Sequence, residues 1–177
     1  MTYTLHVAGL TRELPLCPVN DSLDIAAFVI FSDVELTVAC AAELLKKVGE
    51  FDVIVTAESK GIPLAYECAR QSGKQYIVGR KSTKLYMTDP ISVNVKSITT
   101  AKMQTLYLSQ EDAAQLRGRR VLIIDDVIST GESLIALEKL VEAAEGNIVC
   151  KAAVLAEGKA ADRDDIVFLE KLPVFPK

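Results

Sequence analysis

The feature that most constrains the fold of this chain is a repeated alternation of short apolar runs and helical patterns. The runs are too short for core helices and are bounded by turn residues. They lie at 53–55, 76–78, 121–124, 148–155 and 166–169. Strands that alternate with helices are typical of a mainly parallel sheet covered on both faces. We therefore expect an α/β fold with a doubly wound sheet, in which ligands bind at the carboxyl ends of the strands.

Helical patterns fill the intervals between these runs. Ser32 and Glu35 have the spacing of a capping box, so we expect the first helix to begin at Ser32 and to end before Gly49. A second helical stretch opens at Pro63 and reaches Gly73. A third follows the run at 121–124. The apolar faces of the first and third helices comprise Leu36, Cys40, Leu44, Val48, Leu134, Leu137, Leu140 and Val141.

Length and charge restrict the class of protein. With 177 residues, half of them apolar, the chain can build one compact core, and we expect residues 1–177 to form a single domain. The 24 acidic and 20 basic residues give a net charge of −4, the wrong sign for a general nucleic-acid binder.

The N-terminus lacks the pattern of a leader, and no apolar run is long enough to cross a membrane. Four cysteines without a CxxC pair and a single histidine suggest no zinc site and indicate reduced thiols. These features predict a cytoplasmic protein.

The two ends and one middle segment depart from the alternation. Residues 1–30 contain Pro15 and Pro18 and show little helical period, and we expect them to form a small hood with the final LPVFPK. Residues 82–110 are long and polar, with an alternation that suits a hairpin. A connection this long in a compact domain is usually functional.

Two adjacent carboxylates, Asp125 and Asp126, come directly after the run at 121–124. Carboxylates just beyond a buried strand lose hydration and repel each other, so the pair is costly without a partner. Vicinal hydroxyls of a sugar would be good partners. The pair therefore predicts a site for a ribose.

A turn of small residues, VISTGES, leads from this pair into the third helix. The unpaired backbone N–H groups of a helix start, together with the hydroxyls of Ser129, Thr130 and Ser133, can surround a phosphate. Gly131 lets the backbone approach closely. Together the pair and the turn indicate a pocket for ribose 5-phosphate; the plainer alternative is an Asp-Asp turn with helix capping.

The segment VLIIDDVISTGES, 121–133, resembles the signature with which type I phosphoribosyltransferases bind 5-phosphoribosyl-1-pyrophosphate (PRPP). The resemblance implies that Asp125 and Asp126 are the catalytic carboxylates, which orient the ribose and offset the positive charge that develops at C1. It also implies which residues hold the ribose and its 5-phosphate: Asp125, Asp126, Val127, Ser129, Thr130, Gly131, Glu132 and Ser133.

Two upstream segments resemble family motifs for the leaving pyrophosphate. TAESKGIPLA, 56–65, is similar to the pyrophosphate loop of the purine, adenine phosphoribosyltransferase-like branch, whose members usually carry arginine where this chain has Lys60. VGRKSTKL, 78–85, matches a basic cluster that reaches the pyrophosphate. The implied pyrophosphate-binding residues are Glu58, Ser59, Lys60, Gly61, Arg80, Lys81 and Lys84. Helix capping and a solvated basic turn are the alternatives.

By position, residues 82–110 match the mobile active-site loop that closes over the reacting centre in this family and excludes water. The candidate closing contacts are Lys96, Ser97, Lys102 and Tyr107. The stretch SVNVKSITTAKMQ has no glutamate, unlike the adenine-type loop, and its shape is closer to xanthine-type and archaeal hypoxanthine/guanine-type relatives. Phe28 and Phe31 are candidates for stacking on the base, with core packing as the alternative.

The resemblance implies a purine salvage enzyme, most readily of the adenine type. Ribose 5-phosphate would pass from PRPP to a purine base with release of pyrophosphate. Mg²⁺ would be bound mainly through PRPP, with no ligand taken directly from the protein. Family members are commonly homodimers. The alternatives are xanthine or hypoxanthine/guanine specificity, or a non-catalytic PRPP-binding regulatory protein.

Overall fold

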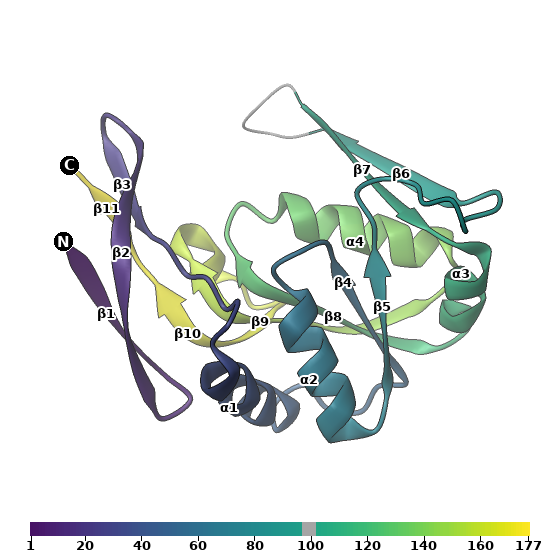
Figure 1. The fold of residues 1–177 in the computed structure, drawn as a ribbon, viewed down its shortest axis with the longest axis horizontal. Helices are drawn as coiled ribbons and strands as arrows, with labels where there is room; N and C mark the ends of the chain where they lie inside the picture. Colours follow the sequence, from purple (N-terminus) through teal and green to yellow (C-terminus); the bar gives the residue numbers. More distant parts are fainter. Residues whose placement is uncertain (97–101) are drawn as a thin grey trace.

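A central sheet of five parallel strands organises the computed structural model, which describes residues 1–96 and 102–177 (Figure 1). The strand order is β10-β9-β8-β4-β5, and every pairing is parallel. The strands span β4 Val53–Ala57, β5 Gln75–Gly79, β8 Arg120–Ile128, β9 Asn147–Glu157 and β10 Val167–Leu172. The predicted α/β fold with a mainly parallel sheet is therefore confirmed.

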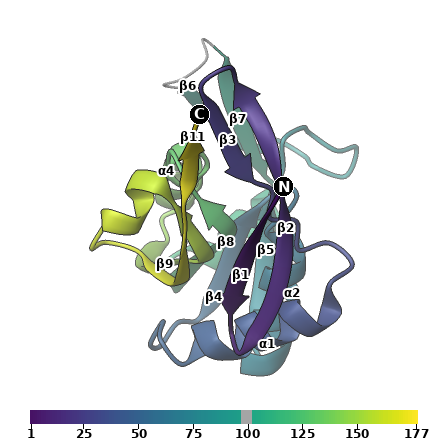
Figure 2. The ribbon, with the colours of Figure 1, turned by 90° about the vertical axis from the view of Figure 1, so that its left-hand side faces the viewer.

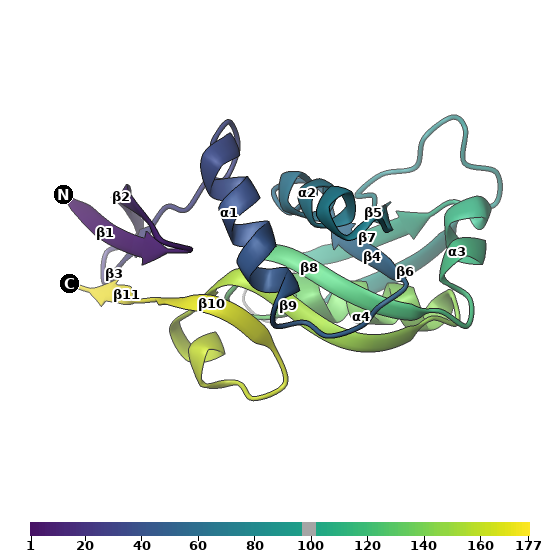
Figure 3. The same cartoon turned by 90° about the horizontal axis from the view of Figure 1, so that it is seen from below.

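Helices cover both faces of this sheet (Figure 3). α1 (Val34–Leu45) and α2 (Ile62–Ser72) pack on one face, in a core that includes Leu44 and Leu64. α3 (Gln110–Leu116) and α4 (Glu132–Ala143) belong to a second core on the other face. The sheet is thus buried on both sides, which explains its continuous aliphatic runs.

The N-cap of the first helix lies one residue after the predicted one. Asp33 is the N-cap, and its Oδ1 accepts a hydrogen bond from the Leu36 N–H at 3.1 Å. Ser32 has a positive φ of 68° and lies outside the helix. Arg12 explains the choice, because it binds Asp33 Oδ2 at 2.7 Å and Glu35 Oε2 at 2.7 Å. The predicted Ser32–Glu35 capping box is therefore wrong.

Both ends of the chain meet in a four-stranded sheet, here called the hood, which stands beside the central sheet (Figures 1 and 2). Its strands, in the order β1-β2-β3-β11, are β1 Thr2–Val7, β2 Leu10–Asn20, β3 Leu23–Ala26 and β11 Val174–Pro176. All of its pairings are antiparallel, and Val174 of β11 faces Ile25 of β3. A hood built from the chain termini is confirmed.

The long middle segment forms an antiparallel hairpin of β6 (Ile91–Lys96) and β7 (Met103–Leu108). Its apolar side chains, including Leu106, pack in the same core as Leu137 and Leu140 of α4. The predicted hairpin is confirmed, but Ser97 lies outside the described residues. Closure of residues 82–110 over a site stays a prediction, as does the assignment of residues 1–177 to one domain. No helix in the described ranges is long and apolar enough to cross a membrane.

Candidate functional site

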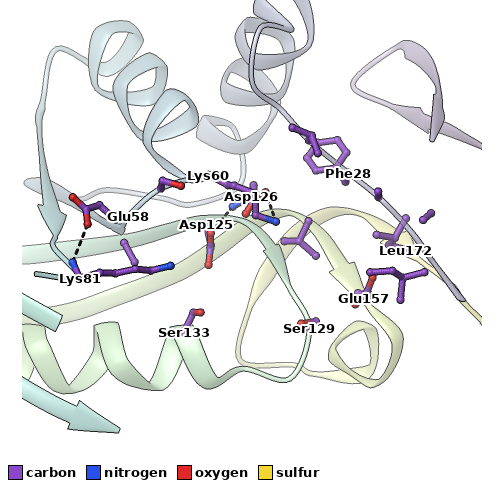
Figure 4. Close-up of a pocket in the computed structure, with 17 residues that line it drawn as sticks. Phe28, Glu58, Lys60, Lys81, Asp125, Asp126, Ser129, Ser133, Glu157 and Leu172 are labelled. Atoms are coloured by element: carbon purple, nitrogen blue, oxygen red, sulfur yellow. Dashed lines mark hydrogen bonds and ion pairs between the residues drawn. The ribbon is translucent and has the colours of Figure 1, made fainter. Parts of the chain in front are cut away.

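A cavity of about 410 Å³ opens where the carboxyl ends of β4, β8 and β9 meet the hood (Figure 4). One end is polar and contains Glu58, Ser59, Lys60, Lys81, Asp125, Asp126, Ser129 and Ser133. The other end is mostly apolar and contains Ile25, Ala26, Ala27, Phe28, Val29 and Leu172, with Glu157 beside them. The cavity can therefore enclose a ligand that is charged at one end and apolar at the other.

Asp125 and Asp126 occupy the last part of β8. The sequence placed the pair just beyond the strand, but β8 continues to Ile128, so that expectation is wrong. Because successive strand residues point to opposite faces, the two carboxylates approach the cavity from different sides of the sheet (Figure 4). Asp126 is only 2 % exposed. Both side chains are thus presented by the strand itself and not by a turn.

The pair has unmet hydrogen-bonding capacity. Asp125 Oδ1 accepts from the Asp126 backbone N–H at 2.8 Å. Asp126 Oδ2 is buried and has no hydrogen-bond partner in the described ranges, and its nearest cation, Lys60 Nζ, lies 3.7 Å away. A buried acceptor without a donor is costly, so a ligand that supplies hydroxyl donors would stabilise the site.

Burial, and then the neighbouring charge of Asp126, raise the pKa of Asp125 to about 8. A carboxyl whose folded-state pKa is raised holds its proton more tightly in the folded protein, so the unliganded protein loses stability as pH rises from 3.8 towards 8. We expect Asp125→Asn to remove this loss. Thermal unfolding without ligand should then show the variant gaining on the wild type between pH 5 and pH 8; a constant difference would contradict the raised pKa.

The turn between β8 and α4 forms a small cradle of about 40 Å³. Gly131 is the N-cap of α4, has φ +82°, and provides no side-chain cap for the first turn of the helix. Residues that line the cradle are Asp125, Val127, Ile128, Ser129, Thr130, Gly131, Glu132, Ser133 and Leu134. The structure therefore brings these residues together around one turn, and their binding of a phosphate stays a prediction.

The loop from 58 to 61 forms the opposite wall. The Glu58–Ser59 peptide bond is cis, and Gly61 is the N-cap of α2. A Cβ at Gly61 would lie 2.3 Å from Thr56 Oγ1 and 3.2 Å from Asp125 Oδ1. Only glycine fits between the loop and the carboxylate pair, so the two motifs are in direct contact.

The basic cluster after β5 divides between the cavity and the surface. Lys81 lines the cavity, and its backbone N–H donates to Glu58 Oε2 at 2.9 Å. Arg80 instead forms an ion pair with Glu58 through Nε and donates from Nη1 to Tyr86 Oη at 2.9 Å. Lys84 is half-buried, and its Nζ donates to Ser82 Oγ at 3.0 Å. Neither Arg80 nor Lys84 lines the cavity, so the structure does not bring them to Lys60.

The remaining predicted residues are also separated by the structure. Phe28 is 4 % exposed and lines the apolar end of the cavity, whereas Phe31 is 45 % exposed and does not line it. Lys96 and Lys102 are exposed at the open end of the hairpin, away from the cavity lining. Tyr107 exchanges backbone hydrogen bonds with Arg80 at 2.8 and 2.9 Å. Of these candidates, only Phe28 lies in the site.

Glu157 and Leu172 line the cavity but were not identified from the sequence. Glu157 is the last residue of β9, and burial raises its pKa, with the charge of Lys60 acting against this. The two residues face each other across the β9–β10 pairing. The rule that ligands bind at the carboxyl ends of parallel strands is the signal that could have located them.

A parallel sheet with a cavity at the carboxyl ends of its strands is the arrangement of nucleotide-binding α/β proteins. Residues 36–174 match the model of the phosphoribosyl transferase domain, and the chain belongs to this family.

Relatives in this family include enzymes and a regulator. The chain is 35% identical to adenine phosphoribosyltransferase of Acetivibrio thermocellus over 142 residues, 78% of this chain and 80% of the enzyme. It is 32% identical to the purine biosynthesis transcriptional repressor of Bacillus subtilis over 113 residues, 64% of this chain but only 39% of the repressor. It is 33% identical to xanthine phosphoribosyltransferase of Exiguobacterium over 122 residues, 68% of this chain and 62% of that enzyme.

Solved structures agree on the fold. Adenine phosphoribosyltransferase from Thermoanaerobacter pseudethanolicus superposes with a TM-score of 0.74 at 24% identity, covering 89% of this chain and 95% of that one.

Proposed function

We propose that the chain is a purine phosphoribosyltransferase of nucleotide salvage, which transfers ribose 5-phosphate from PRPP to a purine base, with adenine as the favoured base. The observation that carries the proposal is the close grouping of three features: the Asp125–Asp126 pair and the loop at Lys60, which line the cavity, and the cradle before α4, which shares Asp125, Ser129 and Ser133 with it. These features suit the hydroxyls, the 5-phosphate and the pyrophosphate of PRPP. The apolar end at Phe28 and Leu172 suits a flat base.

Each wall of the cavity has a role in the proposed reaction. As pyrophosphate leaves, C1 of the ribose gains positive charge, which the carboxylates of Asp125 and Asp126 offset. Lys60 and the positive end of the α2 dipole stabilise the charge on the leaving group. The hood side, with Phe28 and Leu172, excludes water that would otherwise capture the sugar.

The residues present fit a magnesium ion that is held through PRPP. No group of three candidate metal ligands occurs in residues 1–96 and 102–177. The buried Asp126 Oδ2 can accept a hydrogen bond from water on such an ion. When bound, the ion would neutralise phosphate charge.

Adenine is favoured because the relative named for it shares 35% identity across 80% of its length. Xanthine and hypoxanthine/guanine remain alternatives, because enzymes named for those bases share 33% and 38% identity. A PRPP-binding regulator is the second candidate, supported by the similarity to the repressor and by Lys60 in place of the usual arginine.

The decisive experiment measures pyrophosphate release with magnesium and PRPP, testing adenine, hypoxanthine, guanine, xanthine and orotate separately. Turnover with adenine is expected. Turnover with a different purine, and none with adenine, would show that this other purine is the substrate. No turnover with any base, together with measurable PRPP binding, would support the regulator instead.

We further propose a cytoplasmic homodimer. Exposed apolar side chains gather on and beside α1 and α2, where they could meet a second copy: Val29, Phe31, Val34, Val38 and Tyr66. Sedimentation of the wild type should give twice the mass of one chain. The Val34→Glu variant should give a mass closer to that of the monomer. A wild-type monomer at micromolar concentration would contradict this arrangement.

Lys60→Ala should weaken binding of pyrophosphate by about tenfold and that of ribose 5-phosphate much less, because Lys60 lies on the loop and not in the cradle. Calorimetric titration with each ligand measures both effects. Lys139→Ala, an exposed change on α4, is the control and should alter neither. Equal losses of affinity for the two ligands would show that the loop at Lys60 is wrongly assigned to pyrophosphate.

A further inference from the structure

Among the residues that the structure describes, neither lysine nor arginine lines the cradle before α4. Backbone N–H groups and hydroxyls can bind a phosphate, and a nearby cation adds Coulomb attraction for its two negative charges. A cation close to the cradle would therefore strengthen the binding of a phosphate.

Arg163 is such a cation. It follows the 3₁₀ helix Gly158–Asp162, which connects β9 to β10, and its side chain reaches the cradle from outside. A Cβ at Gly131 would lie 3.0 Å from Arg163 Nη1, so the guanidinium contacts the loop at the residue that caps α4. This is a long-range contact between a turn without any recognised motif and the predicted phosphate site.

The guanidinium is held firmly in this position. Arg163 donates to Asp165 from Nε at 2.8 Å and from Nη2 at 2.7 Å, so Asp165 does not engage Nη1. Asp165 Oδ2 also accepts from Lys151 Nζ at 2.9 Å, and Lys151 donates to Glu138 Oε1 at 2.9 Å. Glu138 belongs to α4. The chain of ion pairs thus ties the arginine to the helix that begins at the cradle.

We propose that Arg163 is a positioning residue for the 5-phosphate of the substrate: it supports the loop at Gly131 and supplies the positive charge that the cradle lacks. The role rests on the proposed function, since it requires a phosphosugar in the cradle. Nη1 lies against the loop while the rest of the guanidinium is fixed by Asp165, so no side-chain ordering is needed when the phosphate arrives.

The test compares Arg163→Met with the wild type by calorimetric titration of ribose 5-phosphate and of pyrophosphate. Methionine keeps an unbranched apolar stem and removes the charge. The affinity for ribose 5-phosphate should fall roughly tenfold, as expected for a charge-assisted contact, with pyrophosphate affinity within about twofold of the wild type. Arg163→Lys should recover part of the loss. Arg117→Met, which removes an exposed arginine paired with Glu145, is the matched control.

A pH series separates charge from structure. The second pKa of a phosphate ester lies at about 6, so a site with a nearby cation binds the dianion preferentially and its affinity rises between pH 5.5 and 7. Asp125, whose pKa is about 8, also lines the cradle and opposes the rise as it ionises, in the wild type and in the variant alike. The rise should therefore be smaller in Arg163→Met than in the wild type. Asp165→Asn keeps the arginine but removes the carboxylate that fixes its position. This variant should weaken ribose 5-phosphate binding less than Arg163→Met does.

Either of two results would overturn the role: unchanged ribose 5-phosphate affinity in Arg163→Met, or an equal loss for both ligands with an unchanged pH profile, which would indicate general damage to the fold. A wild type that binds neither ribose 5-phosphate nor PRPP would overturn the proposed function itself, and this role with it. Failure of the Arg163 role alone leaves wild-type binding intact, so the two failures are distinguishable.

Discussion

Replacing both carboxylates, as in Asp125→Asn with Asp126→Asn, should abolish PRPP binding while the protein stays folded. The ribose hydroxyls need acceptors, and each asparagine replaces one acceptor oxygen with an N–H donor. Two charge-assisted hydrogen bonds lost together correspond to a fall in affinity of more than about a hundredfold. The fold should persist, because asparagine has nearly the shape of aspartate and carries no charge for burial to penalise.

Calorimetric titration with PRPP and magnesium measures the binding, and thermal unfolding at the same pH confirms the folded state. The single variants should each lose part of the affinity. Glu111→Gln, which changes an exposed acid on α3, should behave as the wild type. PRPP binding that survives in a folded double variant would mean that the sugar is held elsewhere.

Gly61→Ala should remove nearly all PRPP and pyrophosphate binding. The added methyl group would lie 2.3 Å from Thr56 Oγ1 and 3.2 Å from Asp125 Oδ1. Thr56 is fully buried, so its side chain cannot move into solvent. The backbone at Gly61 has φ −74°, which suits alanine, so the effect is purely steric. Relief of the overlap requires the loop and the carboxylate to separate, at a cost of about 1–3 kcal/mol in stability.

A second substitution provides the rescue. Thr56→Ala removes the side-chain atom nearest to the new methyl group, so Gly61→Ala with Thr56→Ala should regain much of the binding that Gly61→Ala loses. Thr56→Ala alone should bind nearly as the wild type, because Thr56 Oγ1 has no hydrogen-bond partner in the described part of the chain. Wild-type binding by Gly61→Ala alone would show that the loop has more room than the contacts imply.

The sequence predicted the fold well because the sheet is buried on both faces. Runs such as 121–124 are aliphatic at every position, and the glycines at 73 and 131 adopt positive φ angles at helix ends. The cap of α1 could not be predicted in the same way, because Asp33 is selected by Arg12 from a distant strand. The spacing of residues near the start of α1 gives no information about that contact with Arg12.

The site was predicted where contiguous residues form it and missed where distant residues meet. The pair Asp125–Asp126 and the cradle belong to one contiguous segment, the end of β8 and the turn after it, so their motif is visible in the sequence. Arg80 looks like a ligand for pyrophosphate by residue type, yet its Nε is bound to Glu58. Glu157 and Arg163 carry no motif and reach the cavity or the cradle only through the folding of β9 and the turn after it.

The hood has a consequence for the order in which the molecule assembles. Its β3–β11 pairing joins Ile25 to Val174, and Leu172, just before β11, lines the cavity. Closing so long a loop is entropically costly, so contacts between distant parts of a chain form late. On a newly made chain, the acidic pair and the cradle can therefore be in place while the apolar end still lies open. A nascent molecule would hold the sugar phosphate before it can enclose a base.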